Sequence, residues 1–202
     1  DDVESRGLGD VYKRQGMGSG KEADESSSQA LKMLENLLLS GFDKETSLEL
    51  ISTSLINKNE EMFATLDIAI VDLYKGTIEF IKSGACPTYI KNGKKVQIIK
   101  STSLPTGMIN EKNIQTFDRD IQNGEIMLMC SDGIIDANVE YKNKELWVKY
   151  MLEDIETNNT KKIADIILNE AIDNNYGKAK DDMSIVAVSY THLRAHETRR
   201  HL

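Results

Sequence analysis

Two acidic clusters in the sequence have the chemistry of a divalent cation site. Ser131-Asp132-Gly133 follows an apolar run directly, and Asp181-Asp182-Met183 precedes another directly. If these runs are antiparallel neighbouring strands, the end of one meets the start of the other, and the aspartates share one edge of a sheet. Carboxylates gathered without histidine or cysteine favour Mg²⁺ or Mn²⁺. The alternative is that the first cluster is an ordinary turn and the second a solvated loop.

Other chemistries have less support in the sequence. The glycine-rich run from Gly16 to Gly20 could place backbone N–H groups near an anion. It lacks the Lys-Ser/Thr pair of a P-loop and the preceding strand of a dinucleotide site. Cys86, Ser19 and Ser131 have no histidine in the middle of the chain to activate them, which argues against nucleophilic catalysis.

The composition changes sharply at both ends of the 202-residue chain. Five of the six arginines and all three histidines lie in the first fifteen or the last twelve residues, and Arg119 is the exception. We therefore expect residues 1–15 and 191–202 to be foreign or artefactual segments that flank one domain over residues 16–190. A native basic tail is the alternative. Without these ends, 19 basic and 28 acidic residues remain and no histidine, which leaves carboxylate-bound metal as the available chemistry.

Charge and hydropathy exclude several classes of protein. The net charge of -8 argues against nucleic acid as a partner, because neutralising phosphates requires clustered lysine and arginine. No apolar run approaches the 18 or more residues of a membrane span, so we expect no membrane contact from this chain. Its two cysteines have no C-x-x-C spacing, which indicates a reduced, cytosolic-type domain without a disulfide framework.

The elements expected to carry these residues begin with two helices. Residues 22–40 have apolar positions at helical spacing and end at Gly41, a typical C-terminal cap. Asp43 can cap a second helix over residues 44–57.

From Thr65 the hydrophobic period changes to two, which is typical of strands. Asn92-Gly93 between two such runs favours a hairpin with a type I′ turn. The expected strands are 66–73, 77–83, 89–91, 95–99, 114–117, 125–131 and 183–190, and two more helices are expected at 144–155 and 161–174. Helices, antiparallel strands, then helices and a strand predict an α+β sandwich.

Five short motifs, taken together, resemble a known family. In chain order they are Gly16-Met17-Gly18-Ser19-Gly20, Thr65-Leu66-Asp67, Ser103-Leu104-Pro105-Thr106-Gly107, Ser131-Asp132-Gly133 and Asp181-Asp182-Met183-Ser184. This series resembles the catalytic domain of the stage II sporulation protein E family, a group of PPM-type (protein phosphatase 2C-like) serine/threonine phosphatases. The resemblance extends over residues 16–190 in the right order.

The resemblance implies a fold and a metal site. The fold is an α-β-β-α four-layer sandwich of two antiparallel sheets, here lacking its N-terminal strands, with two Mn²⁺ or Mg²⁺ ions at one rim. Asp132 and Asp181 match metal ligands of the family and are the expected catalytic residues. Gly16 matches a backbone ligand, and Asp182 lies in a neighbouring position near the metals. Ions held there would activate a water for attack on the phosphorus of a phosphoserine.

The resemblance also implies partners. The substrate of the family is a phosphorylated anti-anti-sigma factor, whose dephosphorylation activates a sporulation sigma factor. Helices 22–40 and 44–57 resemble the regulatory helices of the family, through which a homodimer could form. By analogy, this chain is a cytoplasmic domain of a membrane-anchored parent protein.

One position departs from the family pattern. The family has an aspartate that bridges both metals immediately before the glycine-rich run, and here that position is Gln15. A neutral amide cannot supply the charge that holds two dications together. We therefore expect a truncated catalytic domain that binds metal weakly and turns over poorly. A stress-response phosphatase of the same superfamily and a catalytically dead binding module remain as alternatives.

Overall fold

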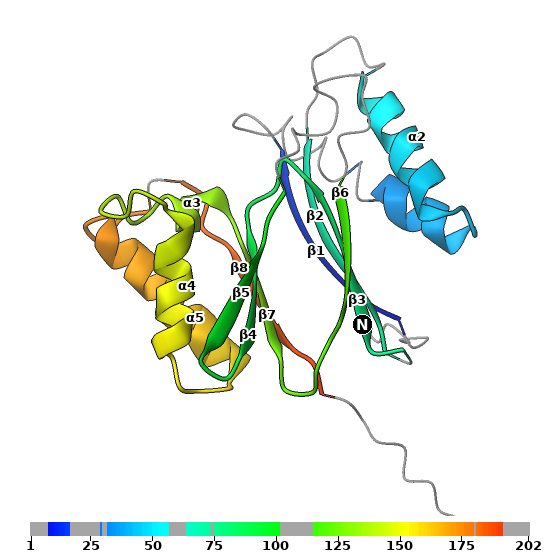
Figure 1. Cartoon of the computed structure of the whole chain (residues 1–202). Helices are drawn as coiled ribbons and strands as arrows, with labels where there is room; N and C mark the ends of the chain where they lie inside the picture. Colours follow the sequence, from blue (N-terminus) through cyan, green and yellow to red (C-terminus); the bar gives the residue numbers. More distant parts are fainter. Residues whose placement is uncertain are drawn as a thin grey trace, which may run out of the picture.

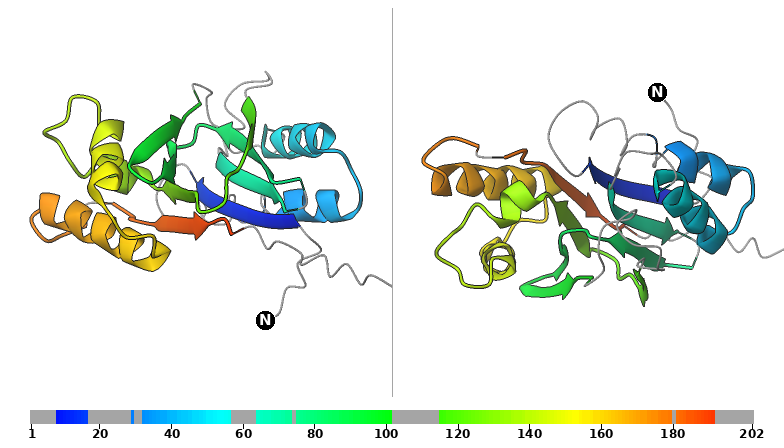
Figure 2. Two further views of the ribbon diagram at one scale, coloured as in Figure 1. Left: turned by 60° about the horizontal axis from the view of Figure 1, so that its bottom comes forward. Right: turned by 90° about the horizontal axis from the view of Figure 1, so that it is seen from above.

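Two antiparallel sheets packed face to face form the centre of the protein, with helices on the outer face of each (Figure 1). The structure, a computed structural model, describes residues 8–16, 29, 32–56, 64–73, 75–101, 115–179 and 181–191. The two views in Figure 2 show the same order of layers, helices, sheet, sheet and helices. The expected α+β class with two antiparallel sheets is confirmed.

Each sheet has four strands. The first sheet contains, in spatial order, β1 (Leu8–Gly16), β2 (Ala64–Asp72), β3 (Thr77–Ser83) and β6 (Gln115–Asp120). The second contains β5 (Lys95–Ile99), β4 (Thr88–Asn92), β7 (Ile126–Cys130) and β8 (Ile185–Ser189). Every neighbouring pair is antiparallel. The short connections that join β2 to β3 and β4 to β5 require this for those two pairs.

Both sheets bury side chains on both faces. Successive side chains along a strand point to opposite faces, so neighbouring residues of one strand enter different hydrophobic clusters. In β2, Ala69 belongs to the cluster between the sheets, together with Phe80 of β3 and Met129 of β7. The neighbouring Ile68 belongs to a second cluster with Leu34 and other residues of the helical side. On the far side of the second sheet, a third cluster joins β7 to α4 (Glu145–Asp154) and α5 (Thr160–Asn174).

Over the first sheet, the first expected helix ends at residue 39, one residue before its predicted end, and the second begins at the predicted Lys44. Residues 32–39 are helical, and Gly41 follows with a φ of +88°, the left-handed conformation that glycine adopts readily. Asp43 then caps α2 (Lys44–Ile56), because its Oδ1 accepts a 2.8 Å hydrogen bond from the Thr46 amide.

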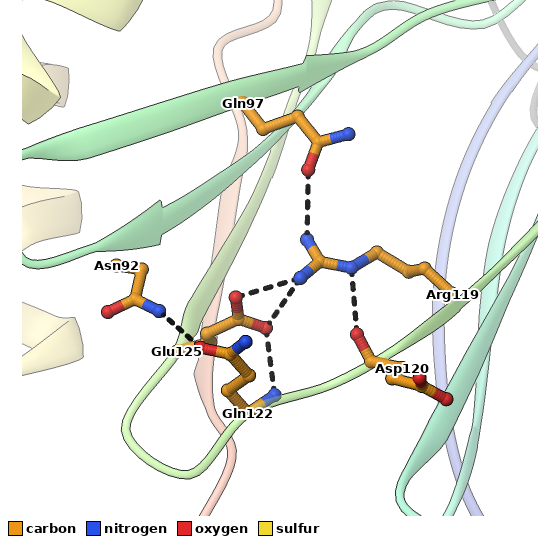
Figure 3. Close-up of polar contacts among 6 residues, drawn as sticks. All are labelled: Asn92, Gln97, Arg119, Asp120, Gln122 and Glu125. Atoms are coloured by element: carbon orange, nitrogen blue, oxygen red, sulfur yellow. Dashed lines mark hydrogen bonds and ion pairs between the residues drawn. The ribbon is translucent and has the colours of Figure 1, made fainter.

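A polar network joins the two sheets at the end where β6 leads into β7 (Figure 3). The guanidinium of Arg119, on β6, donates to both carboxylate oxygens of Glu125, at 2.8 and 2.9 Å. It also donates to Gln97 Oε1 of β5 at 3.3 Å, while the Gln122 amide donates to Glu125 at 3.0 Å. The one arginine in the middle of the chain therefore links a strand of the first sheet to the second sheet.

β1 corrects one expectation of the sequence analysis, that residues 1–15 contribute no strand to the fold. Residues 8–16 pair with β2 along their whole length, from Leu8 opposite Asp72 to Gly16 opposite Ala64. This pairing satisfies backbone N–H and C=O groups on the outer edge of β2. Composition did not indicate the strand because ladder hydrogen bonds are made by the backbone.

The turn between β4 and β5 also differs from its prediction. Asn92 pairs with Lys95, so the two turn residues are Gly93 and Lys94. Gly93 has a φ of +59°. Lys94 does not have a positive φ, because Tyr176 is the one described non-glycine residue that does. A positive φ at the first turn residue alone is typical of type II′, not type I′.

Several sequence features lie outside the described residues. They are residues 17–20 of the glycine-rich run, residues 22–28 of the first expected helix, the motif at 103–107 and residues 192–202.

Candidate metal centre

The end of β7 meets the start of β8, which is the condition under which the sequence predicts that the two acidic clusters share one edge. Cys130, the last residue of β7, pairs with Ile185, the first residue of β8. Beyond this pair, the Ser131 amide donates a 3.0 Å hydrogen bond to the Ser184 carbonyl. The Asp132 and Asp181-Asp182 segments therefore lie at one edge of the second sheet, where the sequence predicts them.

The side chain of Ser131 adds two more contacts between these segments. Its hydroxyl donates to the Asp182 carbonyl at 2.8 Å and accepts from the Ser184 amide at 3.0 Å. The two clusters are therefore adjacent and also joined by hydrogen bonds.

Gly133 lets the two backbones approach closely. It lies in the short helix α3 (Asp132–Ile135), which the sequence analysis did not predict. A Cβ at this position would lie 2.6 Å from the Asp182 carbonyl oxygen and 3.3 Å from Asp181 Cβ. Because the nearest atom belongs to the backbone, glycine is required here for close approach.

The aspartates remain within reach of solvent. Asp181 and Asp182 are exposed, and Asp132 is half-buried. One oxygen of Asp132 accepts from the Gly133 amide at 2.9 Å, and one of Asp181 accepts from the Asp182 amide at 2.8 Å. These local bonds orient the carboxylates relative to their own backbones.

Gly16 lies at the same end of the sandwich but on the other sheet. It ends β1 opposite Ala64, the first residue of β2. Figure 1 places this end of β1 and α3 together at the upper end of the molecule. We call this end the acidic rim. It is marked by Gly16, Ser131 and Ser184 and carries the aspartates Asp132, Asp181 and Asp182.

The described part of the acidic rim fits a hard divalent cation in its chemistry. Its donors are carboxylate oxygens, the ligands that Mg²⁺ and Mn²⁺ prefer. The absence of a Cβ at Gly133 allows the two carboxylate-bearing segments to approach each other closely. Among the described residues, no three His, Cys, Asp or Glu side chains are grouped closely enough to hold a metal ion. The described aspartates thus supply part of a ligand set.

A buried ion pair near the rim was missed by the sequence analysis. Lys82 of β3 donates to Asp67 of β2, and the side chains are 0% and 4% exposed. Lys82 Nζ also donates to the Cys86 carbonyl at 2.8 Å, which links the end of β3 to the β3–β4 connection. The sequence analysis noted Asp67 only as part of the motif Thr65-Leu66-Asp67, and the alternation along a strand does not show which of its faces is buried.

Two other buried titratable groups donate to backbone carbonyls of α4. Burial raises the pKa of the Tyr89 phenol above its ordinary 10.0, and its hydroxyl donates to the Glu145 carbonyl at 3.0 Å. Burial lowers the pKa of Lys91 below its ordinary 10.5, and its Nζ donates to the Leu152 carbonyl near the end of α4. Both groups join the second sheet to α4.

Comparison with known proteins identifies the family. The sequence model described as stage II sporulation protein E (SpoIIE) matches residues 9–191, which is most of the chain. This chain belongs to the SpoIIE family. The resemblance in the sequence motifs is confirmed, and the match includes most of β1.

Individual members of the SpoIIE family are similar in sequence and structure. Stage II sporulation protein E of Bacillus subtilis is 34% identical over 178 residues, which cover 88% of this chain and 22% of the relative. A structure of its PP2C phosphatase domain with a fragment of the regulatory domain superimposes with a TM-score of 0.82 at 30% identity. That alignment covers 93% of this chain and 58% of the other. The chain spans about a fifth of the length of this curated relative.

Solved SpoIIE phosphatase domains include one from a crystal presoaked with manganese. It is 28% identical, with a TM-score of 0.63, and the alignment covers 92% of this chain and 88% of that chain. These matches establish a PP2C-type fold and membership of a serine/threonine phosphatase family. Within the described residues, no helix is both long and apolar enough to cross a membrane.

Proposed function

We propose that this chain is the catalytic domain of a metal-dependent protein serine/threonine phosphatase. Its proposed substrate is a phosphorylated anti-anti-sigma factor, whose dephosphorylation activates a sporulation sigma factor. The observation that carries the proposal is the contact between the Asp132 and Asp181-Asp182 segments at the acidic rim, in a chain of the SpoIIE family. The sequence identity of 34% to a sporulation protein supports the substrate class.

The residues of the rim have separate roles in this proposal. Asp132 and Asp181 would hold Mn²⁺ or Mg²⁺, two ions in all, with Asp182 and the Gly16 carbonyl beside them. When bound, such ions supply the Lewis acidity that makes a water nucleophilic at neutral pH. Ser131 and Gly133 hold the carboxylate-bearing segments together, and the negative charge of Asp132 and Asp181 attracts the cations.

The parent protein supplies further proposals. We infer a membrane-anchored parent and a homodimer formed through residues 32–39 and α2. Leu39 and Phe42, which lie at the turn between these helices, are 80% and 49% exposed, and this exposure supports a contact there.

Gln15 is the feature that supports reduced activity in this chain. It lies in β1 opposite Thr65, one residue before Gly16. A neutral amide contributes no charge to the binding of dications. The same residue favours the second candidate function, a catalytically dead module that binds the phosphoprotein without hydrolysing it.

Metal titration and phosphate release test the proposed function. Calorimetric titration with Mn²⁺ is expected to show weak binding, and phosphate release from the phosphorylated anti-anti-sigma factor should be slow. Gln15→Asp should raise both Mn²⁺ affinity and turnover by at least about tenfold, because it adds a charged ligand. Asp132→Asn should abolish the gain, whereas Asp118→Asn, a change at an exposed aspartate of β6, should leave it intact.

The outcomes separate the two candidate functions. Phosphate release that requires Mn²⁺ and Asp132 establishes the phosphatase. Substrate binding without phosphate release, even with Gln15→Asp, establishes the binding module instead. Activity of the unaltered chain close to that of a complete domain would contradict the expected impairment.

A further inference from the structure

Ser131 occupies the N-cap position of α3 but does not cap the helix. Its backbone is extended, with φ −76° and ψ 165°, and its side chain makes no cap hydrogen bond. A serine at this position ordinarily accepts a hydrogen bond from an amide of the first helical turn. Ser131 is only 3% exposed, so its hydroxyl must find its partners inside the protein.

The hydroxyl is instead used on the segment that leads into β8. It donates to the Asp182 carbonyl at 2.8 Å and accepts from the Ser184 amide at 3.0 Å. The Ser131 amide donates to the Ser184 carbonyl at 3.0 Å. One buried residue therefore makes three hydrogen bonds to a segment about fifty positions later in the chain.

The backbone of Gly133 lies close to the same carbonyl. A Cβ there would lie 2.6 Å from the Asp182 oxygen and 3.2 Å from the Asp182 carbonyl carbon. The Asp182 peptide is thus confined between the Ser131 hydroxyl and the Gly133 backbone. Asp132 lies between these two residues in the sequence, so its backbone is fixed relative to that of Asp181 and Asp182.

We propose that Ser131 is a positioning residue of the metal centre. Its hydroxyl fixes the Asp182–Ser184 backbone in advance, so that the carboxylates of Asp132 and Asp181 keep a set separation before a cation binds. Two carboxylates repel each other when no cation is present, and the preset backbone prevents them from separating. Ser131 contacts neither substrate nor reacting atoms. This inference rests on the proposed function, because the cation is that of the phosphatase.

Amide hydrogen exchange in the metal-free protein tests the positioning itself. Ser131→Ala should accelerate exchange of the Ser184 amide by at least about tenfold, because that amide loses its acceptor. Ser131→Thr, which retains the hydroxyl, should stay close to the parent. Ser189→Ala alters an exposed serine at the other end of β8 and is the matched control.

Two results of the exchange experiment would overturn the positioning role. One is an unchanged Ser184 amide in Ser131→Ala. The other is an equal acceleration of the Leu128 and Val186 amides, which would show a general loss of stability.

Mn²⁺ titration of the same variants, in the chain as it stands and with Gln15→Asp, tests the consequence for the metal. Ser131→Ala should weaken Mn²⁺ affinity by at least about tenfold, the usual effect of removing a group that orients metal ligands. Ser131→Thr should remain within about threefold of the parent, and Ser189→Ala should match it.

The two readouts fail in different ways. Unchanged Mn²⁺ affinity in Ser131→Ala overturns the inference while leaving the proposed function intact. A parent chain that binds no Mn²⁺ even with Gln15→Asp overturns the proposed function, and the exchange of the Ser184 amide then decides whether Ser131 fixes this segment.

Discussion

At the residue scale, the three residues of Ser131-Asp132-Gly133 meet different physical requirements. Ser131 supplies a hydroxyl that both donates and accepts, Asp132 supplies charge, and Gly133 supplies the absence of a side chain. The sequence showed the residue types and their place after an apolar strand. It could not show that serine and glycine contact the same Asp182 peptide, because that contact depends on the pairing of β7 with β8.

Lys82 and Asp67 carry the first stability prediction at this scale. Both side chains are removed from water, so each charge depends on the other for compensation. Lys82→Met should lower the free energy of unfolding by about 3–5 kcal/mol, because it leaves a buried carboxylate without its cation. Urea denaturation followed by circular dichroism measures this loss.

The paired replacement distinguishes a charge effect from a packing effect. Lys82→Met combined with Asp67→Leu should recover most of the loss, since an apolar pair can replace a buried ion pair. Lys75→Met removes the exposed ion pair with Asp72 and should change stability by no more than about 1 kcal/mol. If the double variant is as unstable as the sum of its single variants, the ion pair is not the reason for burying Lys82.

At the scale of elements, the strands with the clearest alternation were the most predictable. The expected bounds of β3 and β5 agree with the structure, those of β7 differ by one residue at each end, and those of α5 differ by one residue at the start. These elements bury one or both faces, so their hydrophobic pattern is determined by the core they enter. The sequence predicted the shared edge of Asp132 and Asp181-Asp182 only on the condition that β7 and β8 are antiparallel neighbours, and the structure meets that condition.

The elements that were missed are those that hydrophobic pattern does not determine. β1 is joined to the fold through backbone pairing with β2, for which residue type is a weak guide. α3 is a single turn of four residues, too short for a helical period to show. The turn after β4 depended on a register shift of one residue, which decides whether Asn92 or Gly93 is the first turn residue.

The N-cap of α2 gives a pH prediction for this element. Hydrogen bonds from the Thr46 amide and hydroxyl lower the pKa of Asp43 below its ordinary 3.8. A carboxyl group with a lowered pKa in the folded state stabilises that state at pH values above its unfolded pKa. This stabilisation is lost as pH falls below 3.8 through the folded pKa.

Thermal unfolding between about pH 2.5 and pH 6 measures this effect. Asp43→Ala should lower the melting temperature at pH 6, and the difference from the parent should shrink as the pH falls below 3.8. Asp43→Asn retains an oxygen that can cap the helix but does not titrate, so its difference from Asp43→Ala should stay constant. A penalty for Asp43→Ala that is the same at both ends of this pH range would contradict the role of the charged carboxylate.

At the scale of the whole molecule, the sandwich has a different polar arrangement at each end. The acidic rim lies where β7 ends and β8 begins, and the Arg119–Glu125 network lies where β7 begins (Figure 3). β7 has five residues, so the two ends are roughly 16 Å apart along the strand. The network ties the sheets together, whereas the rim presents carboxylates to solvent.

This separation predicts that stability and metal affinity can be changed independently. Arg119→Met should lower the free energy of unfolding by about 2 kcal/mol, because Glu125 is 4% exposed and would lose its cation. Arg119→Lys should cost about 1 kcal/mol, since lysine keeps the charge but cannot donate to both carboxylate oxygens in the same plane. Lys94→Met, at an ion pair with side chains 81% and 82% exposed, is the matched control and should change stability by less than about 0.5 kcal/mol.

Mn²⁺ titration of the same three variants, in the Gln15→Asp background, completes the test. Their affinities should equal that of the parent at temperatures where all of them are folded, because no contact of Arg119 reaches Ser131 or Gly133 among the described residues. If affinity falls in step with stability, the spacing between the sheets at the far end controls the rim. The two ends of the sandwich would then act as one unit, and Arg119 would have to be counted among the residues that position the metal centre.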